Sequence, residues 1–284
     1  MAWYSKYLLA FERNPNEISE TIIDEISVKL AKFNKQIEPI CSVVVIAHNE
    51  DHRILGCLWS LADNILNVPT EIIVVNNNST DKTTYLLDRV GACWYDEKQK
   101  GPGFARQCGL NKARGKYHLC IDSDTLYPPY YIATHLNYLS MPNVVCTYGL
   151  WSFMPDAKHS RIGLFFYESL RDIYLRLQNI KRPELCVRGM VMGFRTDLGR
   201  QIGYRTDIIR GEDGSLALAL KQFGKLKFLT TPKVRVVTCS STLDGKGGLI
   251  QNLWFRIKKA FRQFGGLFSS KQEYKDVDSN LIKP

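Results

Sequence analysis

Two aspartates flanking a single serine stand directly after an apolar run in the segment YHLCIDSDTLY, residues 117–127. Asp122 and Asp124 repel each other unless a cation lies near both of them. A divalent ion with oxygen ligands meets this need, since magnesium and manganese sites commonly combine one or two carboxylates with substrate phosphate oxygens. A surface turn is the alternative, because Asp and Ser are common turn residues. The two aspartates alone leave both interpretations open.

A second acidic pair opens a later run of residues with helical spacing. Glu212 and Asp213 lie in the segment RGEDGS. Acids at a helix N-terminus are favoured by the helix macrodipole, which is a purely structural explanation. A positioned carboxylate can also take the proton from an attacking hydroxyl group. This pair is therefore a candidate for a catalytic base.

Short β-branched runs alternate with helical runs before the first acidic pair. The runs SVVVIA, EIIVV, CWY and KYHLCI read as strands, and the segments between them have helical spacing. Strands without polar alternation are typical of parallel sheets that are buried on both faces. In such sheets ligands bind beyond the C-terminal ends of the strands. The polar loops HNED (48–51), NNNSTD (76–81) and DSDT (122–125) are therefore expected to converge on one edge of an α/β sheet.

After residue 127 the alternation is less regular. The runs YYIATHLNYL, HSRIGLFFYESLRDIYLRL and EDGSLALALKQFG predict helices, LCVRGMVMGFR predicts an extended, glycine-broken segment, and KLKFL and KVRVVT predict strands. We expect a helical N-terminal extension outside the main core over 1–38, a main domain over 39–240, and a basic amphipathic tail over 241–284.

Composition indicates the general class of protein. The chain has 284 residues, 45% of them hydrophobic and 23% charged, as in a globular protein with a sizeable core. Its formal charge of +10 points to an anionic partner. Eight cysteines without C-x-x-C spacing, together with the lack of a signal-like or membrane-spanning apolar run, lead us to expect a reduced, cytoplasmic protein.

Four segments taken together resemble glycosyltransferase family 2. They are SVVVIAHNE, IIVVNNNSTDKT, GPGFARQCGLNKARGKYHLCIDSDT and RGEDGSLALALKQFGKLKFL, within roughly residues 41–240. The resemblance implies the GT-A fold, with a Rossmann-like, mostly parallel sheet flanked by helices, a nucleotide-sugar half at 39–126 and an acceptor half at 127–240. It also implies an inverting transfer of a sugar from a nucleotide diphosphate donor to a glycan or a lipid-linked acceptor.

The resemblance also implies roles for residues in the first two loops. The segment AHNE is similar to the family's P-x-x-N-E element, which would place Ala47, His48, Asn49 and Glu50 along the base and ribose of the donor. Asn76 stands where the family usually has an aspartate that contacts the base. This departure leaves the identity of the base open, because an amide both donates and accepts.

A further departure lies two residues on. Asn78 stands where the family has a glycine, and Asn is the non-glycine residue that best tolerates a left-handed backbone.

The remaining motifs imply the chemistry. Arg106 falls at the family's arginine, where a guanidinium would bind the diphosphate. Asp122, Ser123 and Asp124 resemble the D-x-D motif, in which the two aspartates hold Mn²⁺ or Mg²⁺ against the diphosphate. No histidine follows residue 159, so the late histidine ligand of some GT-A enzymes has no counterpart here.

The resemblance assigns the catalytic base and a loop near the acceptor. Asp213 matches the family's base, with Glu212 as an acceptor-binding partner or a substitute. Arg188 and Gly189 resemble the acceptor-side loop, although a glycine-broken buried strand explains them equally well.

The tail has two interpretations. Residues 245–272 contain six Lys or Arg and no acid, with apolar residues at helical spacing. The segment is either a packed or solvated terminal helix, or a helix on an anionic membrane surface that brings the enzyme to a lipid-linked acceptor at the inner face.

Two other functions compete with glycosyl transfer. A sugar nucleotidylyltransferase normally needs a glycine-rich basic loop after the first strand, and AHNEDHR is not one. A nucleic-acid-binding protein is disfavoured because the positive charge is spread along the chain without a recognition module.

Overall fold

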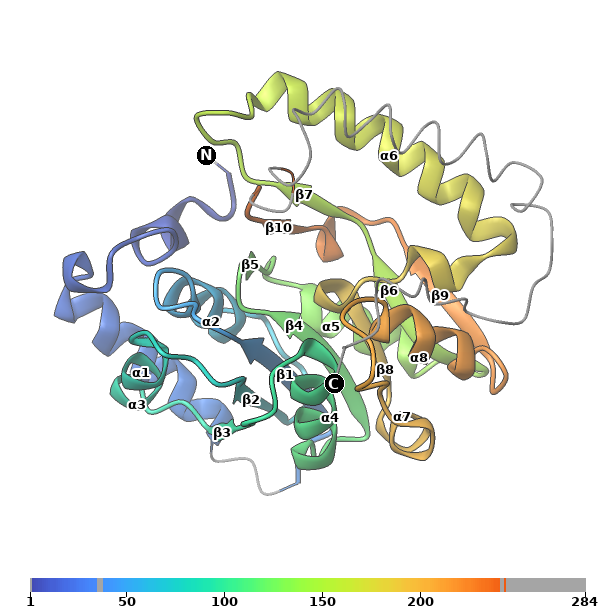
Figure 1. Ribbon diagram of the computed structural model, residues 1–284, viewed down its shortest axis with the longest axis horizontal. Helices are drawn as coiled ribbons and strands as arrows, with labels where there is room; N and C mark the ends of the chain where they lie inside the picture. Colours follow the sequence, from blue (N-terminus) through green and yellow to red (C-terminus); the bar gives the residue numbers. More distant parts are fainter. Residues whose placement is uncertain (1, 35–37, 241–242, 244–284) are drawn as a thin grey trace.

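The computed structural model describes residues 2–34, 38–240 and 243 (Figure 1). The strands are β1 Cys41–Ala47, β2 Thr70–Asn76, β3 Trp94–Asp96, β4 Tyr117–Asp122, β5 Thr125–Leu126, β6 Val144–Gly149, β7 Trp151–Phe153, β8 Met192–Arg195, β9 Lys225–Leu229 and β10 Val236–Thr238. The α-helices are α1 Glu20–Asn34, α2 Ile54–Ala62, α3 Thr83–Arg89, α4 Pro102–Lys112, α5 Tyr131–Leu139, α6 Arg161–Lys181, α7 Thr196–Ile202 and α8 Glu212–Leu220. Short 3₁₀ turns are η1 Ser5–Leu9, η2 Pro15–Glu17, η3 Pro183–Cys186, η4 Gly189–Val191 and η5 Pro232–Val234.

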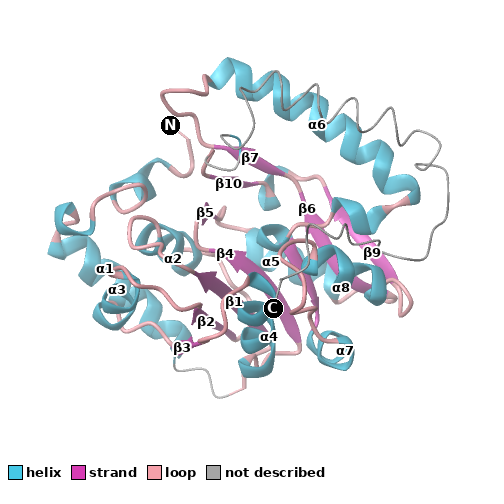
Figure 2. Cartoon of the chain, in the orientation of Figure 1, coloured by secondary structure: helices cyan, strands magenta, loops and turns pink. Residues whose placement is uncertain are grey.

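A seven-stranded sheet in the order β3-β2-β1-β4-β8-β6-β9 forms the centre of the molecule (Figure 2). Strands β3, β2, β1 and β4 are parallel neighbours, and β6 and β9 are parallel to each other. Strand β8 runs antiparallel to both β4 and β6. Helices flank the sheet, so the prediction of a mostly parallel α/β sheet is confirmed.

Both faces of this sheet are buried at its central strands β1, β2 and β4, which explains why these strands lack polar alternation. Side chains alternate between the faces of a strand. Val43 and Val45 of β1 belong to the large apolar cluster that also contains side chains of α1 and α2. Val44 and Val75 belong to a second cluster, with Ala105 of α4. The valines of β1 therefore pack against apolar side chains on both faces of the sheet.

The register of the strands brings the three polar loops to the same edge. Ala47 at the end of β1 pairs with Asn76 at the end of β2, and Ile46 pairs with Asp122 at the end of β4. The three strands thus end at one level of the sheet. The prediction that their loops converge is confirmed.

A smaller sheet, in the order β5-β10-β7, lies beside the central one and carries the longest helix. Thr125 of β5 pairs with Thr238 of β10, and β10 runs parallel to β7. Glu168 of α6 accepts hydrogen bonds from Ser152 Oγ and the Phe153 amide of β7, at 2.8 and 2.6 Å. Figure 1 shows α6 at the outer edge of the molecule, beyond β7 and β10.

The N-terminal segment is helical as predicted, but the expectation that it lies outside the main core is wrong. Tyr7, Phe11, Ile26 and Leu30 are buried in the same cluster as β1. An amphipathic helix needs a surface that covers its apolar face, and α2 provides that surface for α1.

A second difference concerns the segment LCVRGMVMGFR, predicted to be extended. Only Met192–Arg195 forms a strand, and the 3₁₀ turns η3 and η4 precede it. The tail proposed over 241–284 lies outside the described residues except for Leu243. Among the described residues, no helix is both long enough and apolar enough to span a bilayer.

Candidate active site

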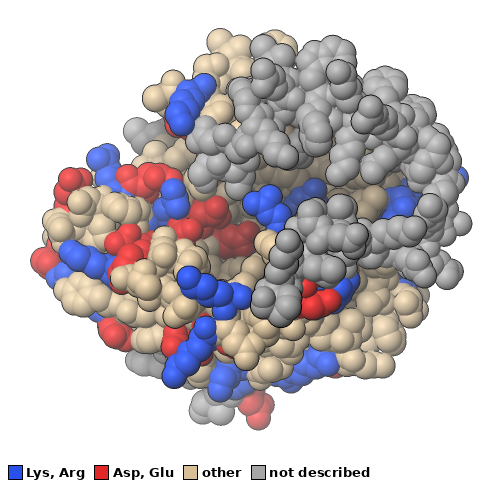
Figure 3. All heavy atoms as spheres, viewed as in Figure 1, with Lys and Arg blue, Asp and Glu red and all other residues tan. Residues whose placement is uncertain are grey.

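A cavity of about 360 Å³ lies at the sheet edge where β1 and β4 end. Its lining includes five acidic side chains and two basic ones, namely Glu50, Asp122, Asp124, Glu212, Asp213, Lys100 and Arg106. Figure 3 shows acidic side chains gathered in a hollow of the surface, with Lys and Arg near them. The acidic pairs at 122–124 and 212–213, far apart in the sequence, therefore meet at one site.

The guanidinium of Arg106 lies between these two acidic pairs. Arg106 is only 2% exposed, and its Nη1 donates to the carbonyl oxygen of Ile121 at 3.1 Å. Its Nη2 pairs with Oδ1 of Asp122, and its Nε lies 3.5 Å from Oδ1 of Asp213. One buried cation thus connects the end of β4 to the first turn of α8.

Gly189 of η4 lies against both Arg106 and Asp213. A Cβ at position 189 would overlap Nη2 of Arg106 and Oδ2 of Asp213. The backbone amide of Gly189 hydrogen-bonds to the Asp213 carboxylate and so favours its charged form. The turn η4 therefore brings a residue without a side chain against the ion pair. A residue with a side chain at this position would collide with Arg106 and Asp213.

Burial dominates the electrostatics of the pair at the start of α8. It raises the pKa of Asp213, while the Arg106 guanidinium opposes the rise. Burial raises the pKa of Glu212 to about 7, and the charge of Asp213 adds to this shift. Both acids lie in the first turn of α8, as the helix N-terminus interpretation also expects. Burial thus disfavours the charged forms of both acids, and the Arg106 guanidinium offsets part of this effect.

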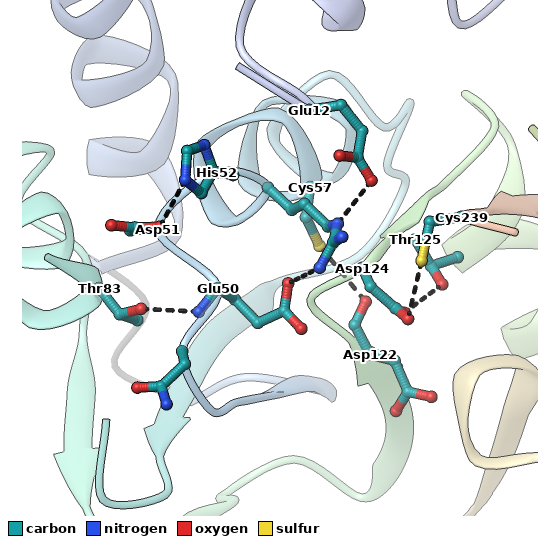
Figure 4. Close-up of polar contacts among 12 residues, drawn as sticks. Glu12, Glu50, Asp51, His52, Cys57, Thr83, Asp122, Asp124, Thr125 and Cys239 are labelled. Atoms are coloured by element: carbon teal, nitrogen blue, oxygen red, sulfur yellow. Dashed lines mark hydrogen bonds and ion pairs between the residues drawn. The ribbon is translucent and has the colours of Figure 1, made fainter. Parts of the chain in front are cut away.

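The two aspartates of the first pair have different environments. Asp124 accepts hydrogen bonds from Thr125 Oγ1 at 3.0 Å and from Cys239 Sγ at 3.4 Å. Burial and the nearby charge of Asp122 raise the pKa of Asp124. The Asp122 side chain is 34% exposed and pairs with Arg106. Figure 4 shows its carboxylate pointing away from the contacts that hold Asp124. The Arg106 guanidinium thus balances the charge of Asp122, whereas Asp124 is held by neutral hydrogen-bond donors.

Glu50 is a third carboxylate in the cavity. Burial raises its pKa to about 7, with Arg53 opposing and Asp124 adding to the shift. Arg53 Nη1 lies 3.1 Å from Glu50, and its Nε donates to Glu12 at 2.7 Å (Figure 4). The N-terminal segment therefore supports this corner of the site.

The other loop residues divide into cavity-lining and bracing positions. Ala47, His48 and Ser123 line the cavity. His48 Nδ1 lies 2.7 Å from the carbonyl oxygen of Asn77, and since that oxygen only accepts, Nδ1 donates. Asn49 braces the loops, because its Oδ1 accepts the Thr80 amide at 2.7 Å.

Asn76 and Asn78 have structural partners or a special backbone. Asn76 is 2% exposed, its Nδ2 donates to Asp96 Oδ1 at 2.8 Å, and its Oδ1 accepts the Ser79 amide at 3.3 Å. Asn78 has φ of 58°, as expected for a position where the family has glycine. Neither residue is among those that line the cavity.

Sequence reasoning missed Asn77, the middle residue of NNNSTD. Its Nδ2 donates to the carbonyl oxygens of Glu97 and Gln99 at 3.1 and 2.7 Å, and its Oδ1 accepts the Gly101 amide at 2.9 Å. Asn77 thereby fixes the loop before α4, whose residues Lys100 and Gly101 line the cavity. Its place in a strand-end loop was the available signal.

Arg188 influences the acidic site through its charge, which opposes the rise that burial causes in the pKa of Asp213, whereas its side-chain contacts lie elsewhere. Its Nη1 donates to the carbonyl oxygens of Leu185 and Val187 at 3.1 and 2.6 Å, and its guanidinium lies 5.7 Å from the centre of the Trp151 ring. The side chain is exposed and is not among the cavity-lining residues.

The candidate ligands for a metal are the carboxylates of Asp122 and Asp124. Within the described residues, no group of three or more His, Cys, Asp and Glu side chains could hold a metal ion. Asp122 and Asp124 in an open cavity nevertheless fit Mg²⁺ or Mn²⁺, which often take one or two carboxylates and complete their shell with water and phosphate oxygens.

Comparison with known proteins identifies similarity at the level of family and fold. Residues 42–203, more than half of the chain, match the family model described as Glycosyl transferase family 2. An uncharacterized glycosyltransferase of Haemophilus influenzae is 28% identical over 136 residues, which cover 44% of this chain and 52% of that protein.

A characterised relative and a solved structure add detail. The UDP-Glc:alpha-D-GlcNAc-diphosphoundecaprenol beta-1,3-glucosyltransferase WfaP of Escherichia coli is 26% identical over 122 residues, which cover 41% of this chain and 48% of that enzyme. The chain thus spans about half the length of these relatives. The mannosyltransferase of Pyrobaculum calidifontis, solved with GDP-Man and Mn²⁺, has a TM-score of 0.56 at 20% identity, covering 91% of this chain and 76% of that one. The shared fold is GT-A.

Proposed function

We propose that this chain, which belongs to glycosyltransferase family 2, transfers a sugar with inversion from a nucleotide diphosphate donor to a glycan or lipid-linked acceptor. One observation carries the proposal: Asp122, Asp124, Glu212 and Asp213 meet in a single cavity around Arg106. Family membership favours this function over nucleotidylyl transfer and nucleic-acid binding.

The first chemical requirement of the reaction is removal of the proton from the acceptor hydroxyl. Asp213 is the proposed base, because it lines the cavity and Arg106 and the Gly189 amide both favour its charged form. Glu212, with a pKa near 7, is the proposed acceptor-binding partner or substitute. As Asp213 takes the proton, the acceptor oxygen bonds to the anomeric carbon on the face opposite the leaving diphosphate, whose bond to that carbon breaks, and this single displacement gives inversion.

Charge on the leaving diphosphate is the second requirement. Asp122 and Asp124 are the proposed ligands of Mn²⁺ or Mg²⁺, and such an ion would neutralise the charge that develops on the diphosphate. Lys100 at the cavity wall is a further cation within this site. Arg106 is proposed to hold Asp122 and Asp213 in place, because its guanidinium contacts these carboxylates and the carbonyl oxygen of Ile121.

The remaining assignments follow from the family pattern. Ala47, His48, Asn49, Glu50, Asn76 and Asn78 are proposed to serve the nucleotide, with Ser123 in the D-x-D motif and Arg188 near the acceptor. The nucleotide sugars of similar proteins differ, UDP-Glc for WfaP and GDP-Man for the Pyrobaculum calidifontis enzyme, so experiment must identify the nucleotide base of the donor for this chain. A lipid-linked acceptor, as in WfaP, would place the reaction at the inner face of a membrane, with the tail as one contact.

A thermal-shift screen of UDP-, GDP- and dTDP-sugars, with and without Mn²⁺ or Mg²⁺, tests the donor and metal assignments. A ligand that binds the native state raises the melting temperature, by an amount set by its concentration relative to Kd. We expect one nucleotide series to raise Tm only when a divalent ion is present. If no nucleotide sugar shifts Tm with either metal, the proposed donor class is wrong.

A further inference from the structure

Helix α6 exposes a continuous apolar surface along its whole length. Large apolar side chains that are 56% to 74% exposed lie at the helical positions Ile162, Phe165, Phe166, Ile173, Leu177 and Ile180. The opposite side of the helix is buried, through residues such as Leu164, Tyr167 and Leu175. Apolar surface of this extent on one helix is typical of an interaction site.

The charges that accompany this apolar surface are all positive. The exposed charged residues of α6 are Arg161, Arg176 and Lys181. The two acids that follow the first helical turn face the protein instead: Glu168 bonds to β7, and Asp172 pairs with Arg171 and Arg235. The outer face of α6, every residue of which the structure describes, therefore combines apolar and basic side chains without an exposed acid.

We infer that the outer face of α6 binds the surface of an anionic lipid bilayer. An interfacial helix has large apolar side chains on one face, flanked by Lys and Arg that contact lipid phosphates. The positive residues at both ends of α6 attract a partner that carries negative charge. The chain's own tail, residues 241–284, carries eight Lys or Arg against four acids and is therefore positive itself, and a second copy of α6 would present the same positive charges. Charge complementarity thus favours lipid over either of them.

The fold connects this helix to the candidate active site. Glu168 joins α6 to β7, β7 pairs with β10, and Thr238 of β10 pairs with Thr125, the neighbour of Asp124. If the proposed function holds, a bilayer against α6 would lie near an acceptor carried by a lipid. The membrane inference itself concerns a surface outside the cavity and is tested without any sugar transfer.

Sedimentation of the full chain with lipid vesicles tests the inference. The vesicles contain phosphatidylcholine alone or three parts phosphatidylcholine with one part phosphatidylglycerol. The test variant carries Phe165→Ser, Phe166→Ser and Ile173→Ser, and the matched control carries Val28→Ser, Ile65→Ser and Phe223→Ser, three exposed apolar residues elsewhere. We expect the test variant to lose at least about tenfold in binding to phosphatidylglycerol vesicles, and the control to stay within about twofold.

A charge variant and a folding control complete the experiment. Arg176→Gln with Lys181→Gln should reduce the preference for phosphatidylglycerol and leave weak binding to neutral vesicles unchanged. Tm must stay close to the wild-type value in each variant, which is reasonable for exposed positions.

Three results would overturn the inference. Undiminished vesicle binding by the α6 test variant would locate the membrane contact elsewhere, for example in the tail. Equal loss in the Val28, Ile65 and Phe223 control would show that α6 has no special role. Wild-type protein that ignores both vesicle types but self-associates, with self-association lost in the α6 variant, would make this face an interface between copies.

Discussion

Gly189 lies directly against the guanidinium of Arg106, so closely that a Cβ at position 189 would overlap Nη2. This contact joins the turn η4 to the ion pairs that Arg106 makes with Asp122 and Asp213. Four segments from different parts of the chain therefore fix the geometry of the acidic site.

We predict that Gly189→Ala disrupts both stability and transfer. The added methyl must displace Arg106 or Asp213, and overpacking of this kind typically costs about 1–3 kcal/mol in the free energy of unfolding. Chemical denaturation measures this loss, and initial rates of sugar transfer measure the effect on the site.

Gly199→Ala is the matched control for Gly189→Ala. A Cβ there would overlap the ring of Phe194, outside the cavity lining. We expect it to lower stability while the folded fraction keeps its transfer rate. Equal rates in the two alanine variants would show that Gly189 has no role beyond packing.

Removal of the buried cation should be costly in a pH-dependent way. Arg106→Met leaves Asp122 and Asp213 without their shared partner, and breaking a buried ion pair commonly costs about 3–5 kcal/mol. The loss of the guanidinium raises the pKa of Asp213 further, so at low pH this carboxyl is neutral and tolerated. The destabilisation should thus be larger at pH 8 than at pH 5, as urea unfolding would show.

Arg195→Met provides the comparison for that experiment. Arg195 pairs with Asp197 at 2.7 Å, but the two side chains are 42% and 59% exposed. Exposed pairs contribute about 0–1 kcal/mol, so this variant should unfold almost like the wild type at both pH values. A similar cost for the two substitutions would contradict the central role of Arg106.

Exchange of the proposed base should separate binding from chemistry. Asp213→Asn keeps the shape of the side chain and removes its ability to take a proton. Since general base catalysis typically contributes 10²- to 10⁴-fold, we expect transfer to fall by about that factor, while the nucleotide-induced rise in Tm persists. Glu212→Gln should keep most of the activity. Transfer that survives in Asp213→Asn and vanishes in Glu212→Gln would reassign the base to Glu212.

Glu212 should also influence how stability depends on pH. Burial raises the pKa of Glu212 from its ordinary value of 4.5 to about 7 in the folded protein. Between pH 4.5 and about pH 7 the folded protein keeps Glu212 protonated while the unfolded chain releases the proton. The contribution of Glu212 to stability is therefore greatest at low pH and is lost as the pH rises through this range. Glu212→Gln should therefore lose less stability than the wild type between pH 5 and pH 8. Parallel stability curves for the two proteins would contradict the raised pKa.

Asp124 is expected to have opposite effects on stability and ligand binding. Its pKa is raised by burial and by Asp122, so its charged form is unfavourable in the absence of a cation. Asp124→Asn should raise Tm slightly at pH 8 without metal, yet abolish the metal-dependent shift by nucleotide. Asp24→Asn, on the exposed side of α1, should change neither quantity. A normal metal-dependent shift in Asp124→Asn would refute its role as a ligand.

The local pattern of residues predicted the sheet and the edge that carries the site. The apolar runs 42–47, 71–75 and 117–121 predicted strands buried on both faces, and the polar residues after them predicted the sheet edge where ligands bind. These inferences succeed because strand burial and strand ends leave a signature within a few neighbouring residues. The family resemblance, now confirmed by the match over 42–203, rests on the same short segments.

Contacts between distant segments decided the rest. The sequence identifies Arg106, Asp213 and Gly189 as separate candidates, but only close packing joins Arg106 to the other two, each more than 80 residues further along the chain. The N-terminal segment likewise shows an apolar helical face without naming its partner, and only packing against α2 reveals that it completes the core. For α6 the same periodicity predicts a helix, yet which of its apolar residues are buried depends on where β7 lies. Burial is a property of the assembled chain, so no local pattern could distinguish the covered face of α6 from the exposed one.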